Sequence, residues 1–86
     1  MKYSDKLLED NWQIRCKSFK SAIAIQKLIH ETTGHRINID TFQDSNGTYF
    51  SRENGKFRNS YYSPSLSNKY QAKDFLTEKE EIYEIF

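Results

Sequence analysis

Valine is absent from this 86-residue chain, and only 36% of its residues are hydrophobic. Isoleucine, leucine, phenylalanine and tyrosine must therefore supply nearly all of the surface that a core buries. A chain of this length predicts a single domain, residues 1–86. Because a small domain buries a low fraction of its surface on folding, its stability as a monomer is marginal. We therefore expect a homo-oligomer.

Cysteine and long hydrophobic runs are also scarce, and each shortage excludes a class of protein. The single cysteine, Cys16, cannot form an internal disulfide framework. No apolar stretch approaches the ~20 residues of a membrane span. The N-terminus, MKYSDKLLEDNW, lacks the apolar core of a signal peptide. The sequence thus predicts a cytoplasmic protein with no membrane partner.

The net charge of +1 selects no class of partner, but the charges are unevenly distributed. Residues 52–73 contain an excess of basic side chains, namely Arg52, Lys56, Arg58, Lys69 and Lys73 against Glu53. Residues 74–86 are acidic, with Asp74, Glu78, Glu80, Glu81 and Glu84 against Lys79. The chain therefore has a basic middle and an acidic tail.

The first half of the chain predicts a strand followed by a long helix. Residues 1–11 allow a short helical lead-in. Residues 12–17, WQIRCK, alternate between apolar and polar side chains, which is the period of a half-buried strand. Ser18 is a suitable N-cap for a helix over 19–33, and a glycine follows that helix.

The second half predicts three strands and a short helix. The strands are expected at 35–42, at 48–53 and after Asn54-Gly55, the pair that best suits a type I′ turn. Residues 62–70 are rich in serine and predict an exposed connection. Thr77 and Glu80 have capping-box spacing and predict a final helix that presents Ile82, Ile85 and Phe86. The whole is an α+β fold, with a small antiparallel-rich sheet packed on one long helix.

A two-residue turn at Asn54-Gly55 fixes which side chains share a face of the predicted hairpin. One face holds Phe50 and Phe57 together with Thr48, Arg52, Asn59 and Tyr61. The other holds Tyr49, Lys56, Arg58 and, at its end, Tyr62. The pairing of 35–42 with 48–53 has two alternatives. A two-residue Asn46-Gly47 loop places Ile37, Ile39 and Thr41 beside Phe50, whereas a loop one residue longer pairs Phe42 with Phe50.

The predicted helix has one complete apolar face and part of another. Ala22, Ile25, Leu28 and Ile29 lie on the first face. Phe19 and Ile23 lie four residues apart on a different one. Either a neighbouring loop or terminus covers these two side chains, or they form a surface for self-association or for a partner.

Catalytic and metal chemistry find little support in this sequence. Cys16 alternates with Trp12 and Ile14 and is expected to be a core thiol. His30 and His35 have no companion at a ligand spacing, so no metal site is predicted. The glycines lie at turns and form no phosphate loop. We expect a protein that is not an enzyme and has no cofactor.

The outward face of the hairpin is the predicted binding surface. It carries Tyr49, Lys56, Arg58 and Tyr62, and Arg36 could assist. Tyrosine and arginine dominate protein interfaces. The same side chains could hold a small nucleotide, or stack on single-stranded nucleic acid. A partner protein is the preferred interpretation. The net charge of only +1 counts against nucleic-acid binding, because phosphate binding normally leaves a clear basic excess.

Four short stretches resemble a loose group of very small bacteriophage accessory proteins. They are WQIRCK, AIAIQKLI, TYFSRENGKF and KDFLTEKEEI, which lie between Trp12 and Ile82. Members often carry a Gly-Tyr-x-Trp run after the helix, where this chain has Gly34-His35-Arg36-Ile37. The resemblance implies an accessory or anti-defence inhibitor that acts in the host cytoplasm by stoichiometric binding to a host protein.

Overall fold

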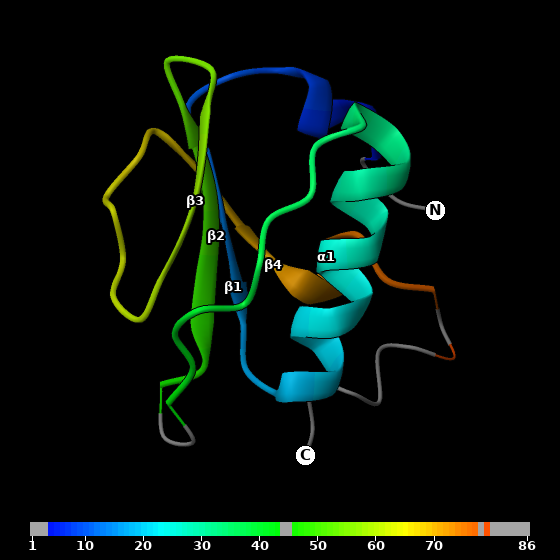
Figure 1. The fold of residues 1–86 in the computed structure, drawn as a ribbon, viewed down its shortest axis with the longest axis vertical. Coiled ribbons are helices and arrows are strands. Elements are labelled where there is room, and N and C mark those ends of the chain that lie inside the picture. The colour runs from blue at the N-terminus through cyan, green and yellow to red at the C-terminus, as the bar shows by residue number, and fades with distance from the viewer. Residues whose placement is uncertain (1–3, 44–45, 78, 80–86) are drawn as a thin grey trace.

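In the computed structural model, the described residues form a four-stranded sheet with one α-helix packed against one face (Figure 1). The structure describes residues 4–43, 46–77 and 79. The elements are η1 (Ser4–Leu8), β1 (Trp12–Cys16), α1 (Phe19–Thr33), β2 (Thr48–Glu53), β3 (Lys56–Ser60), β4 (Asn68–Gln71) and η2 (Ala72–Asp74). The predicted α+β class is confirmed.

The strands lie in the order β3-β2-β1-β4. β1 and β2 pair antiparallel, as do β2 and β3, whereas β4 runs parallel to β1. The sheet is therefore mixed, and β3 and β4 are its two edges. The outward backbone groups of β3 and β4 are therefore not used by a neighbouring strand of this sheet.

The helix begins and ends where the sequence predicted. The Ser18 hydroxyl accepts a hydrogen bond from the Ser21 N–H at 3.1 Å, and the Ser18 N–H donates to the Ser21 hydroxyl at 3.2 Å. This reciprocal pair satisfies two backbone groups at the helix start. Gly34, with φ of 79°, ends the helix in the left-handed conformation that glycine adopts without strain.

The core lies between α1 and the inner face of the sheet. Ile14 and Phe50 from the sheet and Ile25 and Ile29 from α1 are fully buried. η1 packs against α1 and closes one end through Leu7, which is fully buried, although Leu8 is 59% exposed. The lead-in predicted over 1–11 thus contains one buried leucine and one exposed leucine.

The β2–β3 hairpin has the register that the Asn54-Gly55 turn predicted. Glu53 pairs with Lys56, and Phe50 pairs with Asn59. Both turn residues have positive φ, 52° for Asn54 and 79° for Gly55, as a type I′ turn requires.

The strand predicted at 35–42 is wrong. These residues have no regular secondary structure and join no ladder, and an isolated bridge, Gln43 with Gly47, precedes β2. The reason is that β1 and β3 already occupy both edges of β2, so neither predicted register is available. The alternation still places Ile37 in the core, and Ile39 packs against it.

The connection predicted over 62–70 is too long. Residues 68–70 belong to β4, and Leu66 is buried with 7% of its surface exposed. β4 forms because its backbone pairs with the edge of β1, which no local pattern in NKYQ indicates. The predicted final helix lies almost entirely outside the described residues.

Candidate functional site

The hairpin presents two different faces, as its alternation predicted. Phe50 is fully buried beneath α1, and Phe57 is half-buried against the core. On the other side, Arg58 and Lys56 are exposed, and Tyr62 beyond the strand is 63% exposed. Tyr61, predicted to face inward, is 46% exposed, because β3 ends at Ser60.

The outer face of the sheet is crossed by residues 61–67 (Figure 1). This segment joins β3 to β4 at the opposite edge, and α1 already occupies the inner face. The side-chain amide of Gln13 donates to the Ser63 hydroxyl at 2.8 Å, and its oxygen accepts from the Leu66 N–H at 2.8 Å. Gln13 and Ser51 are buried as a result. The outer face is therefore not an open platform.

This crossing separates the two tyrosines that the sequence placed together. Tyr49 is half-buried beside Arg15 of β1. The ring of Tyr62 packs edge-on against Tyr61, with centroids 5.2 Å apart. Within the described part of the chain, no ring contact joins Tyr49 to Tyr62, so the two rings do not form a common stacking surface.

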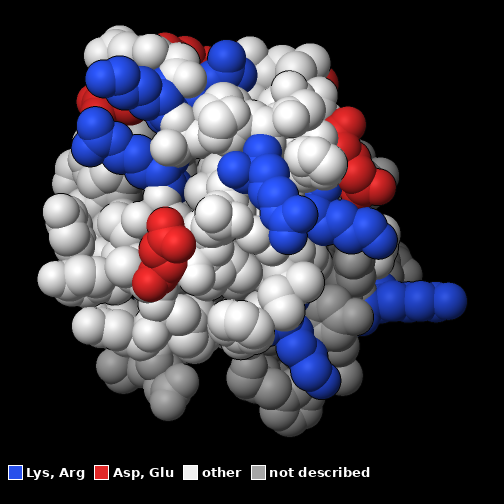
Figure 2. All heavy atoms as spheres, in the orientation of Figure 1, with Lys and Arg blue, Asp and Glu red and all other residues white. Residues whose placement is uncertain are grey.

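Two other predicted residues do come together, at the edge of β3. A shallow groove of about 350 Å³ separates β3 from the segment 35–40. Arg36 and Arg58 line it from opposite sides, and Asp40 is the acidic residue in its wall. Basic side chains are prominent on this side of the molecule (Figure 2).

The wall of the groove formed by residues 35–42 is fixed in place, because this segment is attached to the hairpin. The His35 ring stacks on Phe57, with centroids 4.3 Å apart and planes at 12°. The side-chain oxygen of Asn59 accepts from the backbone N–H groups of Asp40 at 2.9 Å and Thr41 at 2.8 Å. The Asn59 amide also donates to the Thr48 hydroxyl at 2.6 Å. One half-buried asparagine thus joins three segments.

A second hollow, of about 210 Å³, lies on the α1 side of Arg36. It is lined by Gln26, Lys27 and His30 as well as Arg36. The Gln26 amide donates to the Ile37 carbonyl at 2.6 Å and so holds the segment against the helix. Arg36 therefore projects between two hollows, where it is exposed.

Within residues 4–43, 46–77 and 79, no ion pair engages Arg36, Arg58 or Lys56. Arg36 and Arg58 line the groove with one acidic residue, Asp40, and Lys56 lies beside it on β3, opposite the exposed Glu53 of β2. The local charge is therefore positive. A guanidinium group in this setting suits a carboxylate or a phosphate, which it can bind through two parallel hydrogen bonds.

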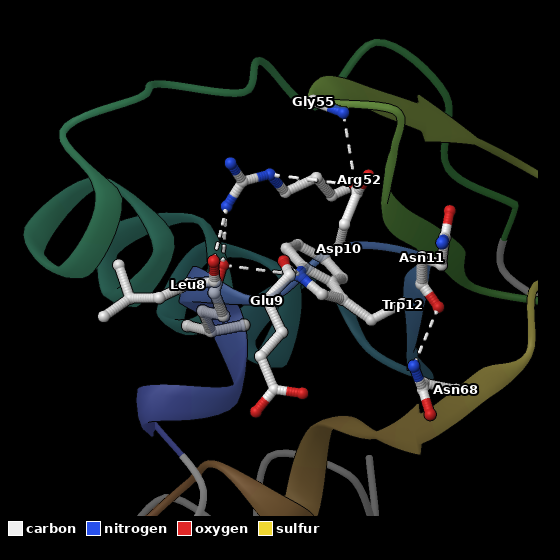
Figure 3. Close-up of polar contacts among 9 residues, drawn as sticks. Leu8, Glu9, Asp10, Asn11, Trp12, Arg52, Gly55 and Asn68 are labelled. Atoms are coloured by element: carbon white, nitrogen blue, oxygen red, sulfur yellow. Dashed lines mark hydrogen bonds and ion pairs between the residues drawn. The ribbon is translucent and has the colours of Figure 1, made fainter.

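Arg52 belongs to the fold rather than to this surface (Figure 3). Its Nη1 donates to the carbonyls of Leu7 at 3.2 Å and Leu8 at 3.3 Å, and its Nε lies 4.0 Å from the Asp10 carboxylate. Its guanidinium also lies 4.9 Å from the Phe57 ring centroid. The charge of Arg52 thus ties the hairpin to the end of η1.

The same region anchors the N-terminal segment (Figure 3). The Trp12 indole donates to the Glu9 carbonyl at 3.0 Å, and the Gly55 N–H donates to the Asp10 carboxylate at 3.2 Å. These bonds fix the hairpin turn against the residues that precede β1. The turn end of the β2–β3 hairpin is therefore attached to the segment between η1 and β1.

The predicted self-association residues lie away from the groove. Phe19 is 52% exposed and Ile23 is 46% exposed. The Phe42 ring meets Phe19 edge-on at a centroid distance of 5.6 Å. The segment that contains Phe42 therefore covers part of Phe19, as one of the two alternatives predicted. Much of both side chains still faces solvent.

No described helix has the length and apolar character needed to cross a bilayer. Over the same residues, no cluster of three or more His, Cys, Asp or Glu side chains is arranged to hold a metal ion.

Comparison with family models, with curated proteins and with solved structures found no match to this chain. The resemblance to small phage accessory proteins therefore stays a prediction.

Sequence reasoning missed most of the groove lining, including His35, Asp40 and Asn59. A signal existed for one of them. Asn59 is a polar residue on the face of β3 that also carries Phe57, and a buried polar side chain needs hydrogen-bond partners. That requirement indicates a segment lying against this end of the hairpin.

Proposed function

We propose that this chain is a non-enzymatic binding protein that attaches stoichiometrically to an acidic surface of a partner protein. The observation that carries the proposal is the meeting of Arg36 and Arg58 across the β3 groove. Both are exposed and have no ion-pair partner among the described residues. Arginine is among the side chains that contribute most binding energy at protein interfaces.

A partner protein fits this surface better than a nucleotide or a nucleic acid strand. Small-molecule sites are usually concave and bury most of the ligand, whereas this groove is shallow. Single-strand binding needs aromatic rings in a row along a basic channel. Tyr49 is half-buried, and Tyr62 packs on its neighbour Tyr61 instead. Sequestration of a small nucleotide signal and single-strand binding are the alternatives.

The biological setting comes from the sequence resemblance alone. It favours a phage-type accessory protein, with a host protein as the partner and inhibition of a host defence as the outcome. An inhibitor of this kind needs a rigid surface rather than a catalytic site. The segment 35–42, held by Asn59 and Gln26, supplies such a surface.

Reversing the charge of both arginines, Arg36→Glu together with Arg58→Glu, should abolish partner binding without unfolding the protein. Each hydrogen-bonded charge pair contributes about 1.5–3 kcal/mol, so losing two should weaken binding by at least about 100-fold. The measurement is retention of partner proteins from host lysate by tagged protein, followed by titration of the purified partner. The thermal unfolding temperature of the variant should stay within a few degrees of the parent.

Lys69→Glu is the matched control. Lys69 is exposed on β4, at the opposite edge of the sheet, and should tolerate the change. Equal binding by the parent and the double variant would refute the assignment of this surface. A rise in unfolding temperature with added nucleotide, or affinity for oligonucleotides that falls steeply with salt, would favour the alternatives instead.

A further inference from the structure

The edge of β3 exposes backbone groups that a further strand could pair. A two-residue turn makes Glu53 and Lys56 a hydrogen-bonded pair, and successive pairs alternate between bonded and non-bonded. Phe57 and Asn59 are therefore in non-bonded pairs and direct their N–H and C=O groups away from β2. Within the described residues, these groups make no hydrogen bond.

The opposite wall of the groove is similar. Residues 35–40 have no regular secondary structure and join no ladder. The Ile37 carbonyl bonds to Gln26, and the Asp40 N–H bonds to Asn59. The N–H groups of Arg36 and Asn38 make no hydrogen bond in the described part of the chain. An extended backbone laid beside β3 in this groove would thus meet the unpaired N–H and C=O groups of Phe57 and Asn59.

The charges on the edge select the chemistry of the occupant. Lys56 and Arg58 are two residues apart on β3, so they share the outer face at a spacing of about 7 Å. Acidic side chains at alternate positions of an added strand would lie opposite them. The residue between those acids would point to the other face, beside the His35 ring that stacks on Phe57.

From this arrangement we infer that the groove accepts an extended acidic segment of the partner protein, added as a fifth strand beside β3. The segment has the pattern acidic–apolar–acidic. Main-chain hydrogen bonds to Phe57 and Asn59 supply affinity, and carboxylates facing Lys56 and Arg58 supply selectivity. The inference rests on the proposed function and specifies how the partner is bound.

A second copy of β3 is a poor occupant of the same edge. Pairing two copies would bring the basic side chains of Lys56 and Arg58 near those of the neighbour, and like charges across a strand pair are destabilising. Basic residues on an edge strand deter such pairing in many proteins. Lys56 and Arg58 therefore favour a strand with acidic side chains, whose charge is complementary to theirs.

The test is a titration of the ¹⁵N-labelled protein with a synthetic nine-residue peptide, Thr-Thr-Glu-Val-Glu-Val-Glu-Thr-Thr. At saturation, hydrogen exchange at the Phe57 and Asn59 amides should slow by at least about tenfold, because both become hydrogen-bonded. A peptide with lysine in place of glutamate should not bind. A peptide with methylated backbone nitrogens at its valines should bind at least about tenfold more weakly.

The outcomes separate the inference from the proposed function. If peptide binds but the two amides stay unprotected, or if the methylated peptide binds equally well, strand addition is wrong while an acidic docking surface stands. If no peptide binds but partner retention still needs Arg36 and Arg58, strand addition is again wrong and the function stands. If the acidic C-terminus of a second copy protects the two amides without any peptide, the assigned occupant is wrong.

Discussion

Replacing Gly47 with alanine should leave the chain unfolded at 25 °C, with a loss of more than about 4 kcal/mol. The φ of Gly47 is 74°, which alanine adopts only with strain. An added Cβ would overlap the carbonyl oxygen of Cys16 and lie 3.0 Å from the Lys17 Cα. Both are backbone atoms at the end of β1, so relief requires a shift of the central sheet. Circular dichroism across a thermal scan measures the loss.

Gly55→Ala is the control for the strain of positive φ alone. Gly55 has a similar φ of 79°, but among the described residues no atom lies within 4 Å of a Cβ built there. Its replacement should cost only about 1–2 kcal/mol. A folded Gly47→Ala protein, or equal losses in the two variants, would contradict the close approach of Gly47 to β1.

Truncating Phe50 to alanine should destabilise the protein by about 3–5 kcal/mol. Phe50 is fully buried in β2, where it pairs with Ile14 on the helix-facing side. Its removal leaves a cavity beneath α1. The free energy of unfolding in urea measures the cost, and Phe19→Ala offers the same chemical change at a position 52% exposed. That second change should cost about 1 kcal/mol, from partial burial against Phe42.

The same pair of variants tests the homo-oligomer that the sequence predicts. If Phe19 and Ile23 form a self-association surface, stability should rise with protein concentration, and Phe19→Ala should remove that dependence. Sedimentation of both variants at several concentrations provides the measurement. If Phe19→Ala lowered the free energy of unfolding as much as Phe50→Ala at every concentration, Phe19 would be a core residue. That result would contradict its exposed position in this structure.

Local chemistry made part of this fold predictable. The turn at Asn54-Gly55 fixes the register of a hairpin, because both residues tolerate positive φ and the loop length sets the pairing. Ser18 and Gly34 likewise delimit α1 through contacts within a few residues. In each case, the residues that determine the structure lie next to it in the sequence.

The strand order could not be predicted, because it depends on competition between distant segments. Residues 35–42 have the alternation of a strand, yet β1 takes the place beside β2 that they would need. β4 lacks alternation and forms only because β1 offers it an edge. That order forces residues 61–67 across the outer face, which explains why Gln13 and Ser51 are buried there.

The sequence predicted two basic side chains of the candidate site but not the groove that they line. Arg36 and Arg58 were both chosen from the sequence, since arginine is common at interfaces. Their meeting across a groove depends on Asn59, whose side chain holds Asp40 and Thr41. The predicted role of Tyr49 and Tyr62 as partners in stacking required an open outer face, which the crossing segment removes.

Hydrogen exchange of the free protein, resolved by residue, tests the central claim that the edge of β3 is available. Arg58 and Ser60 belong to hydrogen-bonded pairs with Ser51 and Tyr49, so their amides should be protected. The amides of Phe57 and Asn59 should exchange much faster. Protection of all four amides to the same degree would mean that something already covers this edge, and the proposed binding groove would have to be abandoned.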